Sequence, residues 1–175
     1  MDIVKEIIII LLSATLALNF ANIEESNKTH KKVIKLLETT HCDINSQYMH
    51  NNVLLDEYNN EFIDAKILKA NTMHNTALIE TILDNDTVIA TVSPLMFSVL
   101  TSELRNLNSF YDFLTNAEDN KNIITMALSV KSHNETILWA LDTEIKHLQK
   151  LYSEKELESL YQEYIDNKYQ KIEIN

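Results

Sequence analysis

The 175-residue chain contains no glycine, although average usage of about 7% would give roughly a dozen. Phosphate-cradling loops, dinucleotide-binding turns and nucleophile elbows all need glycine, because the backbone there approaches a ligand or bends sharply. Tight β-hairpins also depend largely on glycine. With one proline, Pro94, the chain has almost nothing that breaks a helix. The sequence therefore predicts an all-helical protein whose turns are made by Asn and Asp.

Positive charge and cysteine are also scarce. The chain has 15 basic and 26 acidic residues, for a net charge of −11, and Arg105 is the only arginine. Binding to duplex DNA or RNA draws on a surplus of Lys and Arg, so we expect no binding to a DNA or RNA duplex. The single cysteine, Cys42, excludes an intrachain disulfide and suits a reducing compartment.

The longest apolar run lies near the N-terminus. Residues 7–21 carry no charge and span about 22 Å as a helix; extension to residues 3–23 gives about 31 Å, close to the bilayer core. A cleaved signal peptide, a buried core helix and a membrane span are the three interpretations. Apolar residues all round the helix favour the span. We therefore expect a transmembrane anchor over residues 1–23 and a cytoplasmic helical domain over residues 24–175.

Four lysines follow this run, namely Lys28, Lys31, Lys32 and Lys35, while one lysine precedes it. By the positive-inside rule, the protein is expected in the inner membrane with its N-terminus outside and its C-terminal domain in the cytoplasm. The four lysines form one helical stripe. That stripe is either an ordinary solvated face or a contact with anionic lipid headgroups.

Residues 26–70 read as one long helix with a near-heptad apolar seam. This pattern predicts self-association into a homo-oligomer through the seam. The expected interface residues are Leu37, Ile44, Tyr48, Asn51, Leu55 and Phe62. Asn51 either fixes the register of the oligomer or marks a solvent-facing break.

The rest of the chain predicts shorter helices. One helix ends at Asp84, and residues 88–92 resemble a strand that has no partner. Ser93 and Pro94 form a helix start, with Ser as the N-cap, for a helix that reaches residue 116. A helix over residues 122–152, with an interruption at 132–134, precedes a capping box that opens a helix over 154–168. We expect a four- to five-helix soluble bundle attached to the membrane helix.

No catalytic constellation and no cofactor motif is visible in the sequence. Two Glu-x-x-His pairs, Glu38/His41 and Glu144/His147, match the spacing of di-metal bundles. Because the composition alone gives about half such a pair by chance, and the remaining Glu ligands have no supporting pattern, we expect no metal site. Cys42 is interpreted as a buried structural thiol. The sequence thus predicts a protein that is not an enzyme.

Two segments resemble a known group of proteins. One is the Lys-Leu-Leu-Glu run at residues 35–38 with Asn45, and the other extends from Leu83 through Val92-Ser93-Pro94 to Asn108. They resemble a loose group of small bacterial membrane-anchored helical proteins of unassigned function. The layout is also similar to membrane effectors of anti-phage systems, including ancillary effectors of type III CRISPR. That resemblance implies an oligomer, a nucleotide site shared between subunits and perturbation of the membrane on activation.

Two functions follow from these expectations. The first is a membrane-anchored oligomeric sensor-effector, in which the soluble domain binds a small anionic nucleotide. Arg105 is the only arginine, and its guanidinium can donate two parallel hydrogen bonds to the phosphate of such a ligand. Asn106 and Asn108 lie beside it in sequence. The alternative is a membrane-tethered scaffold that binds a protein partner through the long helix.

Overall fold

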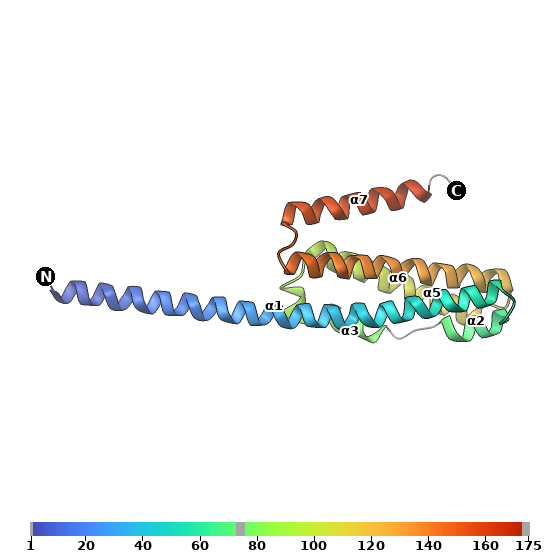
Figure 1. Cartoon of the computed structure of the whole chain (residues 1–175), viewed down its shortest axis with the longest axis horizontal. Coiled ribbons are helices and arrows are strands. Elements are labelled where there is room, and N and C mark those ends of the chain that lie inside the picture. Colours follow the sequence, from blue (N-terminus) through green and yellow to red (C-terminus); the bar gives the residue numbers. More distant parts are fainter. Residues whose placement is uncertain (1, 73–75, 173–175) are drawn as a thin grey trace.

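The computed structural model describes the backbone of residues 2–72 and 76–172, and the side chains of Thr15 and of residues 18–72 and 76–167. Within these ranges every regular element is a helix, as the missing glycines predict (Figure 1). Six of the helices have seven or more residues, and α4 is a single turn. The helices are α1 (Asp2–Asn59), α2 (Ala65–Thr72), α3 (Ala77–Leu83), α4 (Asp86–Ile89), α5 (Pro94–Asn116), α6 (Asn120–Leu148) and α7 (Glu154–Ile172).

Helix α1 is a single rod of 58 residues, which corresponds to about 87 Å. Its N-terminal part extends alone from one end of the bundle, and its C-terminal part lies along α6 (Figure 1). Helix α6 also packs on α5 and α2, α3 lies against α5 and α1, and α7 forms a separate outer layer. The bundle begins close to Val33, the first fully buried residue among the described side chains.

Local capping decides where most helices begin. Ser93 is the N-cap of α5, with an extended backbone, and its hydroxyl accepts from the N–H of Met96. Asn85 and Asp119 cap α4 and α6 in the same way. These caps satisfy the free N–H groups of a first helical turn. They confirm the start predicted at Ser93 and Pro94. The Asn85 cap starts helix α4 just before residues 88–92, the segment that resembles a strand without a partner.

Two helix ends use a left-handed residue that is not glycine. Glu61 and Lys150 both have φ of 62°. At each, the N–H of that residue and the N–H of the next residue return to the preceding helix. Glu61 donates to Tyr58 and Phe62 to Glu57, and Lys150 donates to His147 and Leu151 to Lys146. This is the Schellman motif, in which glycine usually occupies the left-handed position. The prediction that Asn and Asp make the turns is thus wrong at these two positions.

The seam of the long helix is the core of the monomer. Leu37, Ile44, Asn51 and Leu55 are buried, at 0%, 1%, 1% and 6% exposure. They pack within the chain, since the C-terminal part of α1 contacts α6, α2 and α3. The prediction that these four side chains meet a second copy is therefore corrected. An apolar seam marks a helix that needs a partner, and here α6 is that partner.

Other boundaries differ modestly from the expected ones. The helix predicted over residues 26–70 breaks after Asn59 and resumes as α2. Helix α6 runs without interruption through residues 132–134. Helix α7 begins at the predicted capping box and extends to Ile172.

Most of the membrane span predicted over residues 3–23 lies on residues whose side chains are outside the described part. In the part of the chain that was searched, no helix is long and apolar enough to cross a membrane.

Candidate ligand cleft at the base of the long helix

A cleft lies at the end of the bundle from which α1 projects. There the turn between α4 and α5, the C-terminal end of α6 and helix α7 enclose a cleft of about 680 Å³. Helix α7, which lies as an outer layer in Figure 1, lines one side of this cleft. The cleft is lined by Thr91, Val92, Ser93, Pro94, Leu95, His147, Glu154, Leu157, Glu158, Tyr161, Gln162 and Ile165.

A buried carboxylate fixes the α5 side of this cleft. Glu144 of α6 is 0% exposed and accepts two hydrogen bonds from Ser93, one from its backbone N–H at 2.8 Å and one from its hydroxyl at 2.6 Å. Because the same hydroxyl also caps Met96, it links the start of α5 to the C-terminal half of α6. A buried carboxylate costs several kcal/mol unless it is hydrogen-bonded. Ser93 supplies both donors.

Tyr161 of α7 lies next to this pair. Its side chain is 1% exposed, and its hydroxyl has no hydrogen-bond partner in the described structure. Burial raises the pKa of the Tyr161 phenol far above its usual value, the negative charge of Glu144 raises it further, and Ser93 opposes the shift. The hydroxyl therefore stays protonated.

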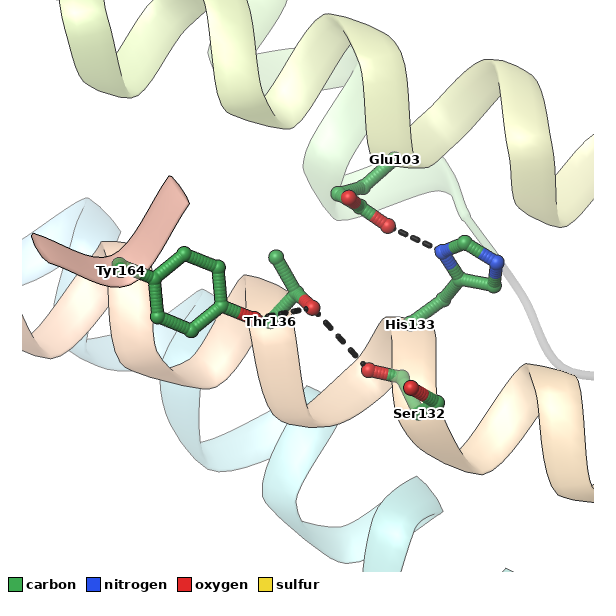
Figure 2. Close-up of polar contacts among 5 residues, drawn as sticks. All are labelled: Glu103, Ser132, His133, Thr136 and Tyr164. Atoms are coloured by element: carbon green, nitrogen blue, oxygen red, sulfur yellow. Dashed lines mark hydrogen bonds and ion pairs between the residues drawn. The ribbon is translucent and has the colours of Figure 1, made fainter. Parts of the chain in front are cut away.

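The aromatic side chains behind the cleft hold α7 on the bundle. The ring of Trp139 stacks on Tyr164, with centroids 4.1 Å apart, and meets the edge of Tyr161 at 4.9 Å. Tyr164 also shares a hydrogen bond of 2.7 Å with Thr136 of α6 (Figure 2). At the other end of the contact, Ser153 and Glu156 form the predicted capping box at the start of α7. The bonds from the Ser153 backbone and hydroxyl lower the pKa of Glu156.

A second cleft continues the first toward α1. It shares Thr91, His147 and Glu154 with the first cleft and is lined on the α1 side by His30. Its volume is also about 680 Å³. The two clefts together thus reach from α7 to the residue of α1 that lies just before the bundle begins. A ligand bound here contacts both the outer helix and the base of the projecting helix.

An ion pair lies further along the bundle, outside this cleft. Glu103 of α5 faces His133 of α6 (Figure 2), and the two side chains are 6% and 15% exposed. The ring of Phe110 lies 5.0 Å from that of His133. Because both partners are largely enclosed by the α5–α6 contact, the pair joins these two helices and offers no open site for a substrate.

The residues of the expected anion site lie outside the two clefts. Arg105 and Asn108 are exposed on α5 and Asn106 is half-buried, and none of them lines the two clefts. Successive helical residues diverge by about 100°, which separates these three side chains. Whether they bind a nucleotide stays a prediction.

The four lysines lie where α1 enters the bundle. All are exposed, and Lys28 pairs with Glu24 at 2.7 Å. Of the expected interface residues, Phe62 is 78% exposed, and Tyr48 is half-buried and donates to Glu135 at 2.9 Å.

Metal ligands do not converge among the described side chains, where no group of three His, Cys, Asp or Glu is found. In the pair Glu144/His147, Glu144 bonds to Ser93 and His147 contacts the carbonyl of Tyr152. Cys42 is exposed rather than buried, which corrects the interpretation as a buried thiol.

Sequence reasoning identified Ser93 only as a cap and missed its bond to Glu144. The one signal available was a Glu on the long α6 helix, and 51 residues separate the two positions. No protein-family model, curated protein or solved structure matches this chain.

Proposed function

We propose that the chain is a non-enzymatic, membrane-anchored oligomeric sensor-effector. The apolar N-terminal part of α1 is the anchor, and the cleft at its base is the sensor. The inner membrane, with the N-terminus outside and the bundle in the cytoplasm, is the location that this proposal assigns. This proposal places the protein in anti-phage defence, because its layout resembles that of membrane effectors of anti-phage systems.

The observation that carries the proposal is the projection of α1 beyond the bundle (Figure 1). Leu18, Phe20 and Ile23 on this projection are 65%, 70% and 58% exposed. Full burial of a large apolar side chain is worth about 1.5–3 kcal/mol. A rod that exposes such residues in water gains by inserting them into a bilayer or against another copy. Because the lysines lie at its base, they would face anionic headgroups.

Liposome flotation of the full-length chain tests the anchor. We expect the wild type to float with vesicles and to stay bound in 1 M salt, since apolar insertion is not screened. The variant Leu18→Asp/Phe20→Asp should lose most of this binding. The matched control is Leu151→Asp/Phe113→Asp, which makes the same changes at exposed bundle positions and should float normally. Wild-type protein that stays in the dense fraction would refute the anchor.

Oligomerisation is tested by mass photometry of the detergent-solubilised chain. Because the seam residues of α1 are buried in the monomer, self-association in this proposal uses the projection. The L18D/F20D variant should then shift toward monomers. In cells, membrane damage that depends on a signal and on residues 1–23 would support the effector role.

The alternative is a membrane-tethered scaffold. Met49 and Val53 favour it, because they lie one turn apart on α1 and are 55% and 51% exposed. A scaffold would lose its cellular effect in the Met49→Asp/Val53→Asp variant. It would keep that effect in a variant whose cleft between α5 and α7 is filled by a bulky side chain. A sensor would show the opposite pattern.

A further inference from the structure

We propose that helix α1 can move by one helical turn along α6, from the register of the structure to a second register in which Asn51 lies beside Asn134. The step moves the projecting end of α1 outward by about 6 Å, because each of its four residues rises about 1.5 Å. One-turn steps of one packed helix past another are a known form of conformational switch. The inference goes beyond the proposed function, since it concerns the bundle and does not require α1 to be a membrane anchor.

Two contacts of Tyr48 define the present register of α1 on α6. Its hydroxyl donates to Glu135 at 2.9 Å, and Nζ of Lys131 lies 5.9 Å from the centroid of its ring. The two helices are antiparallel (Figure 1), because the base of the α1 projection lines a cleft with the C-terminal end of α6. Tyr48 therefore lies at a level between positions 131 and 135, and later residues of α1 face earlier residues of α6.

Asn134 is the group that the present register leaves without partners. It is 0% exposed, yet neither its amide nitrogen nor its amide oxygen has a hydrogen-bond partner in the described structure. A buried amide in this state loses the hydrogen bonds that water gives it in the unfolded chain. This level of the α1–α6 contact is therefore unfavourable as it stands.

The residue of α1 at the level of Asn134 is Gln47, next to Tyr48, and it donates to Asp43 of its own helix. Asn51 is one turn further along α1 and is 1% exposed. A step of four residues toward the N-terminus of α1 brings Asn51 into the place of Gln47. Two amides at one level can exchange hydrogen bonds, because each carries both a donor and an acceptor.

Asn52 gives a second, independent indication of the same step. Its amide oxygen is buried and has no hydrogen-bond partner in the described structure. Because Asn52 is one turn beyond Tyr48, the step moves it into the place of Tyr48, between Lys131 and Glu135. There Lys131 can donate to the amide oxygen, and Glu135 can accept from the amide nitrogen. One movement thus provides partners for unpartnered groups on both helices.

The apolar seam of α1 is compatible with both registers. A step of four residues is a screw movement that also turns the helix by about 40°, so each seam position receives the residue one turn further along. Larger apolar side chains then enter three buried positions: Leu37 in place of Val33, Ile44 in place of Thr40 and Leu55 in place of Asn51. The cost is that Tyr48 enters the place of Ile44, which keeps the second register a minor state.

The connection between α1 and α2 can follow the movement. It comprises residues 60–64 and is folded back, with the N–H of Phe62 bonded to Glu57 and with Glu61 at φ of 62°. Five extended residues span about 17 Å, so opening this turn provides the length that the step needs. It also releases the left-handed backbone at Glu61, which is unfavourable for a residue that has a Cβ.

Disulfide formation between introduced cysteines reads the register, because a disulfide needs Cα atoms within about 7 Å. The full-length chain is used in detergent, with Cys42→Ser to remove the native cysteine. His41→Cys/Asp142→Cys reports the present register, since these positions repeat the relation of Tyr48 to Glu135 one heptad away. None of the probes replaces an asparagine that the proposal uses.

Asn45→Cys/Asp142→Cys reports the second register, because Asn45 is one turn beyond His41 on α1. The matched control is Ile34→Cys/Asp142→Cys. Its two positions are offset along the helix axis by a similar length in the structure, but the step moves them further apart. General loosening of the contact would cross-link both pairs, whereas the proposed step cross-links only the first.

We expect rapid disulfide formation in H41C/D142C, slower formation that goes to completion in N45C/D142C, and much slower formation in I34C/D142C. The measurement is peptide mass spectrometry of protein at monomer mass. Asn134→Leu should slow N45C/D142C by roughly 10-fold, because it removes the buried amide that favours the second register. Asn122→Leu makes the same change at an exposed position of α6 and should leave the rate unchanged.

Equal rates for N45C/D142C and I34C/D142C would overturn the proposal. So would an Asn134→Leu variant that cross-links as fast as Asn122→Leu. Either result from protein that floats with vesicles refutes this inference alone. Cross-linking in the second register by protein that does not float refutes the membrane anchor alone.

Discussion

The Ser93–Glu144 contact provides a quantitative test of the fold, because the chain contains a matched contact elsewhere. Two serine N-caps each bond a glutamate. Ser93 bonds the fully buried Glu144 across 51 residues, and Ser153 bonds the exposed Glu156 three residues away. The chemistry is the same at both caps. The two contacts differ in how far the glutamate is buried and in whether the bond joins two helices that are distant in sequence.

Replacing Ser93 by Ala removes the N-cap of α5, which costs about 1 kcal/mol. It also removes the hydroxyl bond to a buried carboxylate, which is worth about 1.5–3 kcal/mol. The sum is about 2.5–4 kcal/mol. For a chain of this length each kcal/mol lowers the melting temperature by about 2–4 °C, so we expect Ser93→Ala to melt roughly 10 °C below wild type. Ser153→Ala should lose only the effect of an exposed cap.

A double-mutant cycle isolates the bond itself. Glu144→Met keeps the volume of the side chain and removes both acceptor oxygens. Urea unfolding followed by Trp139 fluorescence should give a coupling energy between Ser93→Ala and Glu144→Met of about 1.5–3 kcal/mol. The cycle at Ser153 and Glu156 should give a much smaller coupling. Equal couplings at the two sites would refute the reasoning, since burial would then contribute nothing.

At the two left-handed positions, glycine should stabilise the chain: we expect Glu61→Gly and Lys150→Gly each to raise the free energy of unfolding by about 0.5–1 kcal/mol. Glycine relieves backbone strain of about 1–2 kcal/mol. Part of that gain is offset because glycine gives the unfolded chain more conformational freedom. Gln149→Gly, at a right-handed position (φ −78°), is the control and should destabilise, and gains at all three positions in urea unfolding would contradict the assignment of strain. Because the apolar seam of α1 is buried within the monomer, we predict that Leu55→Glu, at 6% exposure, lowers the free energy of unfolding by at least about 3 kcal/mol. Phe62→Glu, at 78% exposure, should change it by less than about 0.5 kcal/mol. Equal melting temperatures for the two variants would show that the seam is not buried in the monomer.

The sequence by itself determined the helical class and several helix starts. The missing glycines and the single proline leave few alternatives to helix, and a cap such as Ser93 before Pro94 or Ser153 before Glu156 acts within three residues. Such signals are local, because the hydrogen bonds that they describe form between neighbours in the chain. At residues 88–92 the local signals left a strand without a partner as an alternative. β-branched residues suit a strand, but the Asn85 cap and burial of Val88 and Val92 select a helical turn.

Only the tertiary structure decided which surfaces meet. The seam through Leu37, Ile44 and Leu55 shows that α1 needs a partner, but an apolar stripe has the same pattern whether that partner is a second copy or another helix of the same chain. Here α6 folds back and fills the role. The bond between Ser93 and Glu144 and the cleft beneath α7 likewise join segments far apart in sequence. Their geometry depends on how the helices pack, which no spacing along the chain encodes.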